Sequence, residues 1–163
     1  MVRIRGDWFQ MGSPEEEDGR DTNERQHRVC VKEDFDLGRR EVTAAAFRAF
    51  VEANGYRTEA ERGNGCYVWD GKWKQNADKS WRSPGFGPQE THPVVCVSWN
   101  DAQAYIAWLN GRTAGGYRLP TEGEWEYAAG GGTQASRYWR DDLAHDQACG
   151  YANVANEQSV ARM

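Results

Sequence analysis

Residues 116–129 read Gly-Tyr-Arg-Leu-Pro-Thr-Glu-Gly-Glu-Trp-Glu-Tyr-Ala-Ala, and this stretch contains the clearest helix start in the chain. Thr121 is a favourable N-cap, and Glu124 lies three residues later, where its carboxylate can return to the Thr121 N–H to complete a capping box. Trp125, Ala128 and Ala129 follow at helical spacing and predict one apolar face. A run of three glycines at 130–132 predicts that the helix is short.

Two further helices are predicted upstream. Thr43 is an N-cap ahead of an apolar stripe, and Asn54-Gly55 ends that helix; the stripe comprises Phe47, Phe50 and Val51. Ser98 caps the next helix, with Asp101 in its first turn. Its apolar positions recur at i, i+3, i+4 and i+7, and Gly111 is its expected end; they are Ala102, Tyr105, Ile106 and Leu109.

Short apolar stretches between these helices predict strands. They comprise residues 2–11, read as a strand or as a hairpin with Gly6-Asp7 at its turn, and residues 27–37 and 92–98. Asp70-Gly71, flanked by aromatic residues, is the strongest short hairpin signal in the chain. The rest of residues 57–89 reads as irregular chain, and a connection of this length in a compact domain is often functional.

Composition and charge limit the classes of function. The chain has 163 residues, which fits one domain or a large piece of one, and a net charge of −5 without a basic stripe, so we expect no nucleic-acid partner. No apolar run approaches the roughly 18 residues of a membrane span. Eight tryptophans, 18 glycines and a mean hydropathy of −0.91 predict a loop-rich fold with an aromatic core.

Four cysteines, at positions 30, 66, 96 and 149, have no C-x-x-C spacing, which weakens zinc-ribbon and thioredoxin interpretations. An even number in a loop-rich chain favours two disulfides, with buried free thiols as the alternative. The pairing does not follow from the sequence. The cysteines therefore favour an exported or periplasmic protein, and a cytoplasmic one is the alternative.

Few polar side chains have the spacing of a catalytic or metal site. His27, His92 and His145 show no ligand spacing, so hydrogen-bonded structural histidines are expected. Asp141-Asp142 near His145 and Asp146 is the one His/carboxylate cluster, and an exposed loop is favoured over a metal site there. Three tryptophans of the long connection either line a peptide groove or pack in the core; they are Trp69, Trp73 and Trp81.

Five motifs, in order along nearly the whole chain, resemble the formylglycine-generating enzyme (sulfatase-modifying factor) family. They are Phe9-Gln10-Met11-Gly12-Ser13, Leu37-Gly38 with Glu41-Val42-Thr43, His92-Pro93-Val94-Val95 with Val97-Ser98-Trp99-Asn100-Asp101-Ala102, Arg118-Leu119-Pro120-Thr121 with Glu124-Trp125-Glu126-Tyr127, and Tyr151-Ala152-Asn153-Val154. The resemblance implies an α+β, C-type-lectin-like fold with about three short helices and small twisted antiparallel sheets. It also implies one family domain over residues 1–163, incomplete at its C-terminus.

The family's best-known activity oxidises a cysteine of a sulfatase peptide to formylglycine, using oxygen and a copper ion held by two closely spaced cysteines. Those cysteines belong to a later family segment, so no catalytic residue is assigned to this chain. Copper is expected only if that segment is present. The resemblance implies a structural calcium site, with the Asn153 side chain and the Val154 carbonyl as partial ligands.

The resemblance leaves two classes of function open for a bacterial protein of this kind. One is oxidation of a peptidyl cysteine or a related maturation reaction, such as siderophore maturation, with a peptide or protein substrate. The other is a non-catalytic lectin-like module that presents loops to a protein or peptide.

Overall fold

A computed structural model describes residues 1–17, 19–87, 90–133, 135, 138–139 and 151. The chain divides into two compact units, which are described separately. The first comprises the described residues of Met1–Arg39 and Pro120–Asn156, and the second comprises those of Arg40–Leu119. Within the described ranges, no helix has the length and apolarity needed to cross a membrane.

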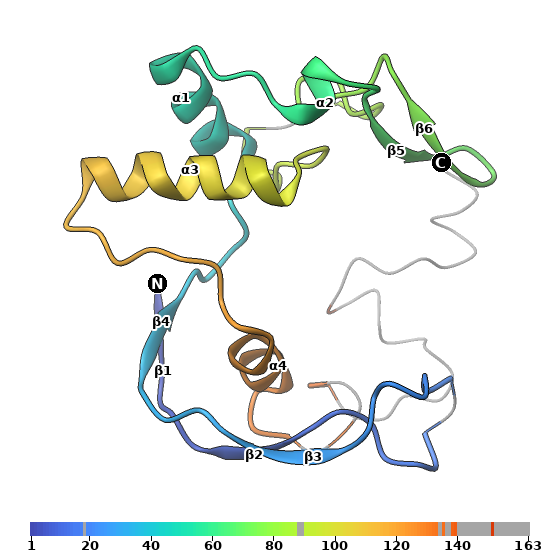
Figure 1. The fold of residues 1–163 in the computed structure, drawn as a ribbon, viewed down its shortest axis with the longest axis vertical. Coiled ribbons are helices and arrows are strands. Elements are labelled where there is room, and N and C mark those ends of the chain that lie inside the picture. The colour runs from blue at the N-terminus through green and yellow to red at the C-terminus, as the bar shows by residue number, and fades with distance from the viewer. Residues whose placement is uncertain (18, 88–89, 134, 136–137, 140–150, 152–163) are drawn as a thin grey trace. The chain divides into compact units, whose positions relative to one another are not determined.

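The first unit contains two antiparallel strand pairs (Figure 1). Strand β1 (Val2–Ile4) pairs with β4 (Phe35–Leu37), and β2 (Trp8–Met11) pairs with β3 (His27–Cys30). Residues 2–11 therefore form strands, as predicted, but the alternative of a hairpin within this stretch is wrong. The single strand predicted over residues 27–37 is in fact two strands, and these supply the partners of β1 and β2.

A one-residue register change separates the two strand pairs. Residues 5–7 lie opposite residues 31–34, so the returning strand contains one extra residue, as in a β-bulge. The Gly6 N–H donates to the Asp34 carboxylate at 3.0 Å, and the Val31 N–H donates to the Asp7 carbonyl at 3.0 Å. A Cβ on Gly6 would lie 2.4 Å from the Val31 carbonyl oxygen, so the bulge requires glycine here.

Helix α4 (Glu122–Gly130) packs on β2, and its ends agree with the prediction. Thr121 and Glu124 form the capping box, and Gly131, with φ of 58°, ends the helix. The predicted apolar face is wrong, because Trp125 is 63% exposed. The Tyr127 ring instead packs on Phe9 with ring centroids 5.2 Å apart.

A small residue and a carboxylate complete the inward face of α4. A Cβ on Gly123 would touch the Val29 side chain at 3.5 Å, so this position lies close to the sheet. Glu126 accepts a hydrogen bond from the Gly12 N–H at 2.6 Å and so satisfies a backbone donor next to the end of β2. The helix therefore contacts the strands through Gly123, Glu126 and Tyr127, none of which belongs to the predicted apolar face.

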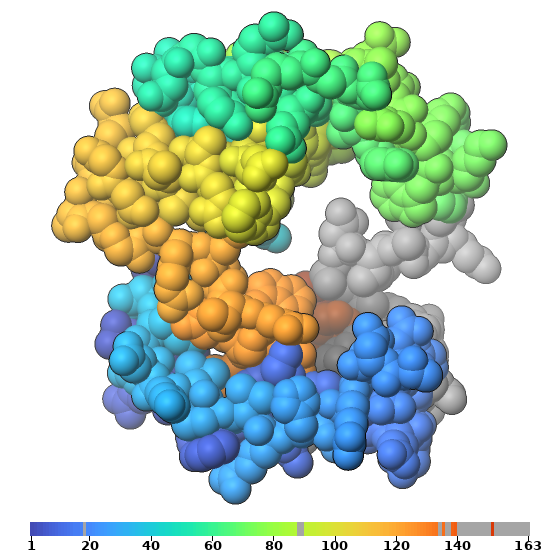
Figure 2. All heavy atoms as spheres, in the orientation of Figure 1, coloured from blue at the N-terminus to red at the C-terminus, as the bar shows by residue number. Residues whose placement is uncertain are grey.

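The second unit is organised around helices α1 (Ala44–Asn54) and α3 (Trp99–Arg112), which lie side by side (Figure 1). Figure 2 shows the teal atoms of α1 packed against the yellow atoms of α3. Phe47 is 1% exposed, and the stripe predicted for α1 is confirmed as the centre of the core. Both predicted ends of α1 are confirmed, at the Thr43 cap and at Gly55, which has φ of 58°.

The face of α3 that meets this core is rotated from the predicted one. Tyr105 packs on the core as expected, but Ala104 and Trp108 accompany it in place of Ile106 and Leu109. The aromatic rings explain the rotation, because Tyr105 and Trp108 both contact the Phe50 ring, at 5.7 Å between centroids. Gly111 lies inside the helix, which ends one residue later.

The long connection contains more regular structure than predicted. Helix α2 (Glu59–Arg62) was not predicted, whereas the hairpin of β5 (Cys66–Trp69) and β6 (Trp73–Asn76) is confirmed. Four helices therefore lie in the described part of the chain, where about three were expected. The strand predicted over residues 92–98 is reduced to an isolated antiparallel bridge between Pro93 and Thr43, and Cys96 interrupts the extended backbone with a left-handed φ of 57°.

Candidate functional site

The β5–β6 hairpin presents an aromatic face. Trp69 pairs with Trp73 and Tyr67 with Gln75, so these positions share one side of the hairpin because side chains alternate along a strand. Tyr67 is 66% exposed and Trp73 is 67% exposed. The Trp69 and Trp73 rings meet edge to face with centroids 5.6 Å apart. We call Tyr67, Trp69 and Trp73 the aromatic face; it offers apolar stacking surface to a partner.

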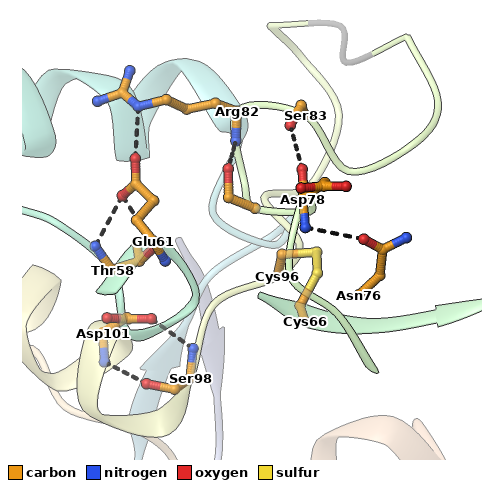
Figure 3. The surroundings of a disulfide bond; sticks show 11 residues. Thr58, Glu61, Cys66, Asn76, Asp78, Arg82, Ser83, Cys96, Ser98 and Asp101 are labelled. Carbon is orange, nitrogen blue, oxygen red and sulfur yellow. Dashed lines mark hydrogen bonds and ion pairs between the residues drawn. A yellow bond between two sulfur atoms is a disulfide. The ribbon is translucent and has the colours of Figure 1, made fainter. Parts of the chain in front are cut away.

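A disulfide attaches the start of this hairpin to the segment before α3. Cys66 and Cys96 are bonded with their Cα atoms 5.4 Å apart (Figure 3). Cys66 occupies the side of β5 opposite the aromatic face, so the bond leaves those rings uncovered. Cys30 is a free thiol, so the prediction of a second disulfide is wrong for this cysteine. Cys149 lies outside the described residues.

Glu61 connects α2 to the core of the second unit. Its carboxylate accepts hydrogen bonds from the Thr58 N–H at 2.9 Å, the Arg82 Nε at 2.9 Å and the Trp81 Nε1 at 3.3 Å. Trp81 is 2% exposed, and the Arg82 guanidinium stacks on it at 4.4 Å from the ring centroid. Trp81 therefore belongs to the core and not to a groove.

Ionisation of Glu61 is coupled to folding. Burial opposes the charged form, but the Thr58, Arg82 and Trp81 donors outweigh it and lower the pKa of Glu61 below its ordinary value. A lowered folded-state pKa gives stability that is fully present above the unfolded pKa, about 4.3, and is lost as pH falls through the folded-state pKa. Glu61 thus stabilises the fold at neutral pH and stops doing so in acid.

We therefore expect the stability difference between the wild type and Glu61→Gln to be largest at neutral pH. It should shrink as pH falls below about 4.3 and the wild-type carboxylate becomes protonated. Urea unfolding at a series of pH values measures this difference. Glu90→Gln is a matched control, because Glu90 makes an exposed ion pair with Arg48. A difference that does not vary with pH would contradict the assignment.

Asp101 is a fully buried carboxylate that joins two helix starts. It is 0% exposed. One oxygen accepts from the Tyr56 hydroxyl at 2.9 Å and the Glu59 N–H at 3.1 Å, and the other accepts from the Ser98 N–H at 2.8 Å. Burial, and then the bond to Asp101, raise the pKa of Tyr56. Asp101 therefore caps α3 through Ser98 (Figure 3), and it also satisfies the first N–H of α2.

The candidate metal ligands lie outside the part of the chain that the structure describes. Asn153 and Val154 lie outside the described residues, as do the acidic pair at 141–142, His145 and Asp146. Within the described ranges, no group of three or more His, Cys, Asp or Glu side chains is placed to hold a metal. His27 is exposed, and its Nδ1 lies 2.9 Å from the Arg25 carbonyl oxygen, which agrees with a structural role.

The described cysteines do not fit the copper site that the resemblance implies. That site requires two closely spaced thiolates, whereas Cys66 and Cys96 are bonded to each other and Cys30 is half-buried on β3. No redox step is therefore assigned to them. The described part of the chain instead offers a disulfide-linked hairpin that presents the aromatic face.

Comparison with known proteins agrees with this architecture. A model of the sulfatase-modifying factor enzyme 1-like domain matches residues 1–161. The chain belongs to this family. It is 33% identical to the formylglycine-generating enzyme of Bos taurus over 94% of this chain and 46% of that protein. It is 38% identical to the inactive Cα-formylglycine-generating enzyme 2 of Bos taurus over 85% of this chain and 51% of that protein.

A solved structure extends the family relationship to the fold. PvdO from Pseudomonas aeruginosa superposes with a TM-score of 0.66 and 32% sequence identity, over 80% of this chain and 47% of that chain. The mixed helix and strand architecture predicted from the resemblance is thereby confirmed. The chain spans about half the length of the curated relatives it matches. Formylglycine-generating enzymes and an inactive relative match this chain at similar identity. Similarity over these residues therefore does not distinguish an active enzyme from an inactive family member.

Proposed function

We propose that the protein acts in the oxidative maturation of a cysteine within a peptide or protein, as the sulfatase-modifying factor family resemblance implies. The family match over residues 1–161 supports this proposal. The reaction depends on a closely spaced cysteine pair in the full-length protein, with copper bound there, because the described cysteines do not fit that role. A related maturation reaction, such as that of a siderophore precursor, belongs to the same proposal.

The described residues contribute substrate contact and not redox chemistry in this proposal. The observation that carries it is the aromatic face, which exposes large rings on a hairpin held from its other side by a disulfide. Tryptophan, tyrosine and arginine are the residues most enriched at energetically important contacts in protein interfaces. An extended peptide bound along the hairpin would bury these rings.

We expect Trp73→Ala to weaken peptide binding by about tenfold, which corresponds to about 1.4 kcal/mol. The ring is 67% exposed, so its removal should leave the stability of the fold unchanged within about 0.5 kcal/mol. Fluorescence anisotropy of the full-length protein with a labelled sulfatase-type peptide containing one cysteine measures the affinity.

Trp99→Ala is the matched control for this experiment. Trp99 is 66% exposed in the same unit, at the start of α3, and is not part of the aromatic face. Equal loss of affinity in the two variants would argue against the hairpin as the contact. A cysteine-to-serine peptide tests whether the cysteine itself contributes to binding.

The second candidate function is a non-catalytic binding module. The 38% identity to an inactive formylglycine-generating enzyme is compatible with this candidate, just as the 33% identity to a formylglycine-generating enzyme is compatible with the first. The experiment that separates the candidates is oxygen consumption by the copper-loaded full-length protein with the cysteine peptide, together with the mass of the peptide product. Peptide binding without oxygen consumption or a change in peptide mass would favour the binding module.

We also propose a structural calcium ion with partial ligands at Asn153 and Val154. Calcium takes six to eight oxygen ligands, so further ligands would have to come from elsewhere in the protein. Calcium is expected to raise the Tm of the full-length protein, since an ion that binds only the folded state stabilises it. Asn153→Ala should abolish the increase, and an unchanged Tm on calcium addition would refute the site.

An exported, periplasmic location in a bacterium is part of the same proposal. The Cys66–Cys96 disulfide supports it, because structural disulfides persist in oxidising compartments. Fractionation of cells that express the full-length protein, combined with thiol labelling of each fraction, tests this location. Recovery in the reducing compartment with free thiols at positions 66 and 96 would contradict it.

A further inference from the structure

The chain contains three Asn-Gly pairs, and the structure distinguishes one of them. They are Asn54-Gly55, Asn64-Gly65 and Asn110-Gly111. Asn-Gly is the sequence most prone to deamidation, because glycine has no Cβ to shield its peptide nitrogen as it attacks the asparagine side chain. Ring closure also requires a backbone conformation that a helix does not allow.

In two of the pairs the asparagine belongs to a helix and its side chain is hydrogen-bonded. Asn54 is the last residue of α1, and its Nδ2 donates to the Phe50 carbonyl at 2.8 Å. Asn110 lies inside α3, where its Nδ2 donates to the Tyr117 carbonyl at 2.9 Å and its Oδ1 accepts from the Tyr117 N–H at 2.8 Å. Attack at either residue would require the helix to open and these hydrogen bonds to break.

Asn64 is in a different position. It lies in the turn between α2 and β5, its side chain is exposed, and glycines precede and follow it. The neighbouring Gly65 N–H makes one bond, of 3.2 Å, to the carbonyl of Ala60 in the four-residue helix α2. Opening this single bond frees the nitrogen for attack. We propose that Asn64 is the site of spontaneous deamidation in this protein.

The reaction needs no oxidant and no cofactor. The Gly65 nitrogen attacks Cγ of Asn64, and the Cγ–Nδ2 bond breaks. Ammonia departs, and a five-membered succinimide ring remains. Water then opens the ring at one of its two carbonyls. The product is an aspartyl residue or an isoaspartyl residue, and the isoaspartyl form places one additional carbon in the main chain.

The position of Asn64 gives the modification a structural consequence. A Cβ on Gly65 would lie 1.8 Å from the Asn76 carbonyl oxygen, so the backbone here fits closely against the end of β6. A lengthened main chain one residue before this contact, and two residues before Cys66, would disturb the base of the hairpin. Deamidation also adds a negative charge beside the disulfide-linked strand.

Trypsin separates the three asparagines, because they fall on the peptides 49–57, 63–72 and 83–112. The native full-length protein is held at mildly alkaline pH and sampled over time, and each digest is reduced and analysed by mass spectrometry. We expect the peptide containing Asn64 to gain about 1 Da at least about tenfold faster than the other two. In urea the three rates should converge, because the chemistry of the dipeptide is the same.

Asn64→Gln should leave peptide 63–72 unmodified on this time scale, with the other two peptides unaffected. Fragment spectra assign the mass change to position 64. Reaction at Asn54 or Asn110 as fast as at Asn64 in the native protein would overturn the proposal, and so would an unreactive Asn64 in the native state. A difference in rates that persists in urea would show that sequence, and not structure, sets the order.

Discussion

Replacing Asp101 with alanine should lower the free energy of unfolding of the second unit by about 4 kcal/mol. The change leaves three donors without their acceptor: the Tyr56 hydroxyl, the Glu59 N–H and the Ser98 N–H. Each buried donor left unsatisfied costs about 1–3 kcal/mol. Because Asp101 is 0% exposed, water cannot replace the carboxylate without a local rearrangement. Urea unfolding followed by tryptophan fluorescence measures the loss.

Two further variants define what the Asp101 result means. Asn100→Ala removes the neighbouring exposed side chain and its 2.8 Å bond to the Glu59 carboxylate, so a loss below about 1 kcal/mol is expected. Asp101→Asn keeps one acceptor oxygen and should be intermediate. A loss below about 1 kcal/mol for Asp101→Ala would show that this carboxylate does not hold the two helix starts together.

Removing the disulfide should have the next largest effect. The double change Cys66→Ala and Cys96→Ala releases a loop with a sequence separation of 30. The chain-entropy relation gives about 3.5 kcal/mol for a loop of this length. Differential scanning calorimetry of the wild type and the double variant should show the corresponding decrease in Tm.

Cys30→Ala is the control for the disulfide variant, since Cys30 is a free thiol on β3 in the first unit. It should leave the unfolding of the second unit unchanged. Reduced wild-type protein should match the double variant. If the reduced and oxidised forms unfold at the same temperature, the bond does not stabilise the fold.

The sequence was sufficient for the three predicted helix caps, whose hydrogen bonds are completed within four residues. Thr43, Ser98 and Thr121 all cap helices as predicted, because each side chain accepts a hydrogen bond from a backbone N–H three residues later. The same signal is present at Thr58 and Glu61. Helix α2 could therefore have been predicted from its capping box.

Contacts between distant segments were not predictable in the same way. Whether residues 2–11 fold back on themselves or pair with residues 27–37 depends on how well two separate stretches fit, and the bulge that joins the two ladders depends on Gly6 and Asp34. The inward face of α4 was missed for a related reason. Its partner surface favours a small residue and a carboxylate, Gly123 and Glu126, and not Trp125.

The candidate site shows the same division. The sequence identified three tryptophans of one long connection and left open whether they bind a partner or fill the core. Only the tertiary structure placed Trp81 in the core and Trp73 in solvent, because strand register and helix packing decide which ring is buried. Likewise, only the tertiary structure shows that Cys66 pairs with Cys96. By itself, the sequence determined the family, the helix starts and the hairpin turn, since these rest on short motifs. Pairing, packing faces and exposure were decided by contacts between residues far apart in the chain.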